Sequence, residues 1–67
     1  MFKISLAAAR VNAEMTQEQA AKAIGVSKQT LCGWENGVSE PTYTKFVELC
    51  NLYKISADYI RLPAKSI

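Results

Sequence analysis

The chain has 67 residues, 49% of them hydrophobic, and carries eight Lys and Arg residues against six Asp and Glu. The resulting net charge of +2 permits binding to nucleic acid but does not by itself indicate it. The apolar runs are shorter than the roughly 18 residues that a membrane span needs, and residues 1–10 lack the hydrophobic segment and cleavage site of a signal peptide. We therefore expect a cytoplasmic protein folded as one small domain over residues 1–67.

Metal and enzyme chemistry have little support in this composition. The chain has no histidine, and its two cysteines, Cys32 and Cys50, do not form a CxxC motif. The residues that a nucleophile and its base require do not cluster anywhere in the sequence. We expect no catalytic activity, metal, cofactor or small-molecule ligand, with Cys32 on the outer side of a helix and Cys50 in the core, both as reduced thiols.

The first helix is expected over residues 2–15. Five apolar residues can share much of one face of it: Ile4, Leu6, Ala7, Val11 and Met15. Arg10 lies among them, which leaves two interpretations. Either its methylene groups cover the core while the guanidinium stays in solvent, or the guanidinium pairs with a buried carboxylate.

The pattern of two short helices joined by a tight turn covers about residues 17–36. Thr16 and Gln19 form a capping box that begins the first of these helices, and Gly25 ends it. The apolar spacing resumes in a new phase after Ser27, which caps the next helix. This is the geometry of a helix-turn-helix.

Three helices are expected from this turn onward. The first covers residues 28–36 and ends at an Asn-Gly pair, and the next begins at the cap Thr42 and continues to about Tyr53. Ser56 caps a short fifth helix, and three residues are expected to fold back from there onto the core: Tyr59, Ile60 and Leu62. Residues 63–67 would form a frayed tail. The prediction is therefore an all-α, compact five-helix fold.

The second helix of a helix-turn-helix can lie in the DNA major groove with its N-terminal residues at the base edges. Here these residues are Lys28, Gln29 and Thr30, followed a turn later by Gly33. Glutamine can form two hydrogen bonds with adenine, lysine suits guanine acceptors or a phosphate, and the threonine methyl can contact a thymine methyl. A polar helix start is also the ordinary composition of a solvated first turn, so the helix-turn-helix frame carries this interpretation.

Candidate phosphate contacts come from helix starts and from basic residues. Gln17 and Ser27 stand at helix N-termini, where backbone amides favour a phosphate oxygen. The loop over residues 38–40 has no Lys or Arg, and Glu40 would repel phosphate, which makes Lys45 one of the main basic candidates. We expect a monomer to bind modestly and a dimer to be required.

Several motifs of the chain resemble those of a known family. They are the run QEQAAKAIGVS at 17–27, Leu31, WENG at 34–37, Pro41 and ISADYI at 55–60. Together they are similar to the phage Cro/CI repressor family of XRE-type helix-turn-helix domains. The resemblance covers about residues 6–62. It implies a lambda-repressor-like five-helix fold, a homodimer on a double-stranded DNA operator, and a role in transcriptional regulation.

The resemblance also implies roles for individual residues. Gln17 would anchor a phosphate, and Asn36 would contact the DNA backbone just after the recognition helix. Arg10 and Glu35 would form a buried salt bridge that ties the first helix to the third, its value lying in orientation rather than net stability. Gly33 departs from the pattern, because many relatives have a base-reading side chain at that position.

Two other functions remain open from the sequence. The same fold could serve as a protein-interaction module or antitoxin-like regulator, and the acidic loop at Glu40 slightly favours this. The chain could also be the DNA-binding part of a longer protein. A DNA-binding regulator would lose binding on Gln29→Ala substitution while its fold survived, whereas an interaction module would tolerate that change.

Overall fold

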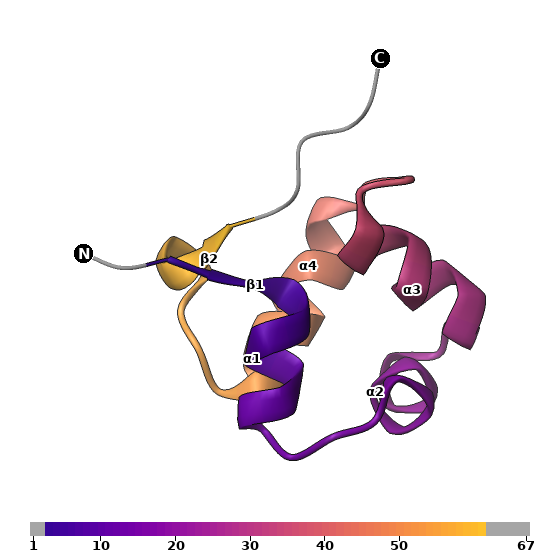
Figure 1. Cartoon of the computed structure of the whole chain (residues 1–67), viewed down its shortest axis with the longest axis horizontal. Coiled ribbons are helices and arrows are strands. Elements are labelled where there is room, and N and C mark those ends of the chain that lie inside the picture. The colour runs from indigo at the N-terminus through magenta and orange to yellow at the C-terminus, as the bar shows by residue number, and fades with distance from the viewer. Residues whose placement is uncertain (1–2, 62–67) are drawn as a thin grey trace.

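The computed structural model describes residues 3–61 and consists of helices with a very short sheet at one end of the molecule (Figure 1). In this part of the chain the α-helices are α1 (Leu6–Asn12), α2 (Gln17–Ile24), α3 (Lys28–Asn36) and α4 (Tyr43–Tyr53). A 3-10 turn, η1 (Ala57–Tyr59), precedes the strand β2 (Ile60–Arg61), which pairs in parallel with β1 (Ile4–Ser5). No helix within residues 3–61 is long and apolar enough to cross a membrane.

The helix boundaries follow from side-chain caps. Ser5, Thr16, Ser27 and Thr42 each precede a helix, and each side-chain oxygen accepts a hydrogen bond from the backbone amide three residues later. The capping box predicted at Thr16 is present, with the Gln19 side chain bonded back to the Thr16 amide. Helices α2 and α3 end at glycines with φ of 75° and 79°, in the left-handed region that a side chain disfavours.

The core lies between the four helices and the buried residue of β2. Leu6, Leu31 and Leu49 are fully buried and come from α1, α3 and α4. The other buried apolar residues are Ala9, Ala20, Ala21, Ile24, Trp34, Cys50, Tyr53 and Ile60. Helix α2 packs against both α3 and α4, and two alanines at this contact allow close approach of the helices. The inner face of α3 is therefore held on a packed surface.

The prediction for the first helix was wrong at both ends. Ser5 caps the helix, so α1 begins at Leu6, and Ile4 before it is extended. The helix ends at Asn12, and Glu14 has a left-handed φ of 59°, which turns the chain toward α2. Val11 is 60% exposed rather than part of the buried face.

The prediction of a fifth helix was also wrong. Ser56 caps only the 3-10 turn, after which Ile60 pairs with Ile4 across the parallel strands. Ile60 does fold onto the core, but Tyr59 is 42% exposed. The fold is thus mostly helical, with four α-helices and one strand pair in residues 3–61. The predicted contact of Leu62 and the predicted tail over residues 63–67 lie outside the described residues.

Candidate nucleic-acid interface

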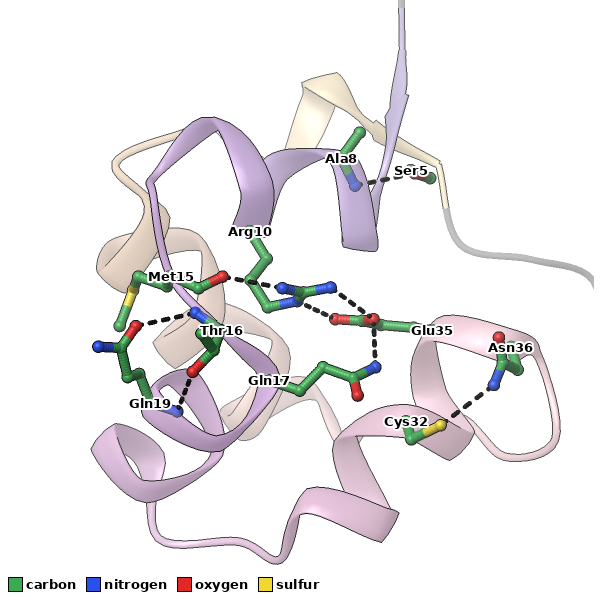
Figure 2. Close-up of polar contacts among 10 residues, drawn as sticks. All are labelled: Ser5, Ala8, Arg10, Met15, Thr16, Gln17, Gln19, Cys32, Glu35 and Asn36. Carbon is green, nitrogen blue, oxygen red and sulfur yellow. Dashed lines mark hydrogen bonds and ion pairs between the residues drawn. The ribbon is translucent and has the colours of Figure 1, made fainter.

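A polar network joins α1, the start of α2 and α3 (Figure 2). Arg10 Nε donates to Glu35 Oε2 at 2.8 Å, and Arg10 Nη1 donates to the carbonyl oxygen of Met15 at 2.8 Å. Gln17 Nε2 donates to Glu35 Oε1 at 2.9 Å. The side chains of Arg10 and Glu35 are only 14% and 4% exposed. Of the two interpretations of Arg10, the structure has the paired one.

The network pairs the charges of Arg10 and Glu35 and orients the side chain of Gln17. The hydrogen bond to Glu35 raises the pKa of Arg10, and burial acts in the opposite direction. Each charged group has the other as its partner, which a mostly buried ion requires. The side-chain amide of Gln17 has two N–H groups, and the bond to Glu35 uses one of them; the second has no partner among residues 3–61 and can donate to a ligand.

Helix α3 has an inner and an outer face. Leu31 and Trp34 are buried on the inner face. We define the outer face as five residues of α3: Lys28, Gln29, Cys32, Gly33 and Asn36. Together with Val38 these residues line a shallow hollow of about 430 Å³. Three of the predicted base-reading residues and the predicted backbone contact Asn36 thus come together on one surface.

Thr30 does not line this hollow. Its backbone amide donates to Ser27 Oγ at 3.1 Å, and the two hydroxyl groups are hydrogen-bonded to each other at 2.8 Å. Both hydroxyls therefore serve the helix start. Thr30 remains exposed on the flank of α3, beside the outer face.

The predicted lysines differ in how their ammonium groups are held. Lys28 Nζ lies 3.8 Å from Glu18 Oε1, and both side chains are largely exposed, so the pair contributes little. Lys45 Nζ donates to the carbonyl oxygen of Ile24 at 2.8 Å and lies 3.6 Å from Glu48 Oε2. Lys45 thereby satisfies a carbonyl at the C-terminus of α2, where a cation also complements the helix dipole.

The end of α3 closes against the loop that follows it. The Gly33 carbonyl oxygen accepts hydrogen bonds from the amides of Gly37 and Val38, the latter at 2.9 Å. A Cβ atom at Gly33 would lie 3.3 Å from Ser39 Oγ and 3.9 Å from Val38 Cβ. The bare backbone of Gly33 lets this loop lie close to the helix, and Val38 becomes part of the wall of the hollow.

Sequence reasoning missed two residues of this surface. Cys32 was expected on the outer side of the helix but not among the contact residues, and Asn36 Nδ2 donates to its sulfur at 3.2 Å. Val38 was assigned only to a loop, although it is 73% exposed beside the outer face. Helical spacing places residue 32 between residues 28 and 36, which is the signal that would have identified Cys32.

Comparison with known proteins gives a family match over most of the chain. Residues 6–60 match the family model described as "Helix-turn-helix". An uncharacterized HTH-type transcriptional regulator, YobD of Bacillus subtilis, is 40% identical over 47 residues, which cover 70% of this chain and 42% of YobD. A second one, YqaE of the same organism, is 28% identical over 60 residues, covering 90% of this chain and 52% of YqaE. The chain spans about half the length of these curated relatives, and no solved structure is a significant match.

Proposed function

The chain belongs to the helix-turn-helix family of the XRE type, and from this premise we propose that it is a sequence-specific DNA-binding regulator of transcription. In this proposal α3 is the recognition helix and enters the major groove, with the outer face toward the base edges. The observation that carries the proposal is the gathering of Lys28, Gln29 and Asn36 on one exposed face of a helix whose other face is buried.

Base readout is assigned to the N-terminal part of α3. Gln29 is exposed and lines the hollow, where its amide can donate to and accept from adenine in one plane. Lys28 is also exposed, and its weak pair with Glu18 is easily exchanged for a guanine acceptor or a phosphate. Thr30 stands at the edge of this surface and is proposed to contact a base only through its methyl group.

Phosphate contacts are assigned to groups on both sides of α3. Gln17 has one side-chain N–H without a partner in the described part of the chain, and its backbone amide lies at the N-terminus of α2. Asn36, at the other end of α3, would contact the opposite side of the groove. The Arg10–Glu35 pair ties α1 to α3, and Gln17 bonds the same carboxylate. We propose that this carboxylate thereby sets the distance between the phosphate contacts of Gln17 and Asn36. Ser27 and Lys45 are bonded within the protein, and we give them a supporting role.

We further propose that the protein acts in the cytoplasm as a homodimer that represses transcription by occupying an operator. One α3 helix covers only a short stretch of duplex, and two helices related by a two-fold axis would read two half-sites about one helical turn apart. Lys28 is the one cation among the five residues of the outer face, so a second copy adds contacts that a monomer lacks.

The experiment is selection from a random duplex DNA pool, followed by salt titration of the enriched sequence. We expect a two-fold-symmetric consensus and a binding constant that falls with salt concentration. Gln29→Ala should weaken binding by about 1–3 kcal/mol and relax the consensus at one position. Asn51→Ala is the matched control, because Asn51 is an exposed amide residue on α4. A pool without enrichment and feeble binding at low salt would contradict the proposal and favour a protein-interaction module.

A further inference from the structure

The hollow on the outer face differs in character from a purely polar surface for base edges. Three of its lining residues, Cys32, Gly33 and Val38, carry no charge and no strongly polar side chain, and we call this part of the hollow the notch. The other three lining residues, Lys28, Gln29 and Asn36, are polar. A weakly polar surface beside hydrogen-bonding side chains suits a ligand that presents a small apolar group next to polar ones.

Val38 is an exposed apolar residue with a fixed backbone. It is 73% exposed at the end of α3, and its backbone amide is anchored on the Gly33 carbonyl oxygen at 2.9 Å. This bond fixes the backbone at Val38 beside Gly33. An exposed valine in an anchored position offers a fixed apolar surface to whatever contacts the outer face.

The major groove offers a single apolar group on its base edges, the C5-methyl of thymine. We propose that the notch formed by Cys32, Gly33 and Val38 receives a thymine methyl group and that these residues select thymine at one position of each half-site. This inference rests on the proposed DNA-binding function and assigns three specificity-determining residues within it. The occupant follows from the continuity of the notch with the polar residues that face the base edges.

The same chemistry belongs to 5-methylcytosine, since both bases have a methyl group at C5. Thymine also presents the O4 acceptor, whereas cytosine presents an N4 donor. Lys28, which also lines the hollow, can only donate, so it suits O4 of thymine and not N4 of 5-methylcytosine, whereas Gln29 can serve either base. The two sources can be separated by experiment.

The first test replaces each thymine of the enriched duplex, one at a time, by deoxyuridine. At one thymine of each half-site we expect the substitution to lower the affinity of the protein for the duplex about fourfold, as the loss of one buried methyl group predicts. Val38→Ala should reduce the ratio of thymine to deoxyuridine affinity at that position toward one. Val11→Ala is the matched control, because Val11 is also an exposed valine but lies on α1.

Three outcomes would overturn the inference while leaving the proposed function intact. In the first, deoxyuridine is bound as well as thymine at every position. In the second, the ratio of thymine to deoxyuridine affinity is the same in Val38→Ala as in the parent. In the third, the half-site position assigned to the notch shows a base preference only when the pool contains 5-methylcytosine. This would assign the notch to a methylated cytosine. By contrast, a pool without any enrichment would contradict DNA binding itself.

Discussion

The two faces of α3 differ in how firmly their side chains are held by the rest of the protein. On the inner face Leu31 is fully buried, and Glu35 is bonded to both Arg10 and Gln17. On the outer face, Lys28 forms a long, exposed ion pair with Glu18. The comparison teaches that the orientation of α3 depends on the inner face, whereas substitutions on the outer face should change binding without changing the fold.

The largest expected effect on stability comes from Glu35→Ala. The substitution leaves the guanidinium of Arg10 mostly buried without its charge partner, which typically costs about 3–5 kcal/mol. The free energy of unfolding by urea measures this loss. The control is Glu18→Ala, which breaks the exposed pair with Lys28 and should cost less than about 1 kcal/mol. Equal losses for the two variants would contradict the contrast between the faces.

A second variant separates pairing from burial. Replacing both partners, as in the double substitution Arg10→Met and Glu35→Leu, removes the unpaired charge and should recover most of the stability that Glu35→Ala loses. In the double variant Gln17 loses its acceptor, the Glu35 carboxylate, so DNA binding should be weaker than in the parent. Full recovery of DNA binding in the double variant would show that the ion pair does not position the interface.

The next effect concerns Tyr53, buried behind the inner face. Its hydroxyl has no hydrogen-bond partner within residues 3–61, and burial together with the charge of Glu35 raises the pKa of Tyr53 to about 12. The ordinary pKa is about 10, so the contribution to stability is complete below pH 10 and is lost as the pH rises toward 12. The loss should amount to about 2–3 kcal/mol.

Tyr53→Phe is the control for this pH dependence. It removes the titrating group and an unsatisfied hydroxyl, so its stability near neutral pH should equal or exceed that of the parent. The difference in unfolding free energy between parent and variant should grow in favour of Phe between pH 10 and 12. A constant difference across this range would contradict the assignment.

The smallest effect on stability is expected on the outer face. Lys28→Ala should leave the urea midpoint nearly unchanged, because the side chain is exposed and its ion pair with Glu18 is weak. If Lys28 contacts a phosphate, the slope of log binding constant against log salt should fall by about one. A midpoint shifted as far as that of Glu35→Ala would show that the outer face also supports the fold.

The sequence predicted the local structure where a short-range signal exists. Caps such as Thr16 and Ser27, and the glycine at position 25, set the bounds of α2 and α3 directly from residue type. The strand pair escaped prediction because Ile4 and Ile60 are far apart in the chain, and two-residue strands leave no alternating pattern. The cap Ser5 was overlooked within an apolar run, and this misplaced the start of α1.

The candidate site was predictable to the extent that it follows from helical spacing. Gln29, Gly33 and Asn36 follow one another at intervals of four and three residues, which places them on one face of the helix, and Lys28 directly precedes Gln29. The hydrogen bond of Lys45 to Ile24 joins two helices through a long side chain, and spacing carries no information about it. The place of Val38 beside Gly33 depends on the path of a loop, which only the folded chain determines.

The most direct test of the central claim is protection of Cys32 from alkylation by bound DNA. Cys32 is partly exposed on the outer face, whereas Cys50 is buried and burial raises the pKa of its thiol, so the reagent should modify Cys32 first. With the enriched duplex in saturating excess, we predict that modification of Cys32 slows to the rate set by the unbound fraction, while Cys50 is unaffected. Unchanged modification of Cys32 in the saturated complex would contradict the claim that the outer face of α3 binds DNA.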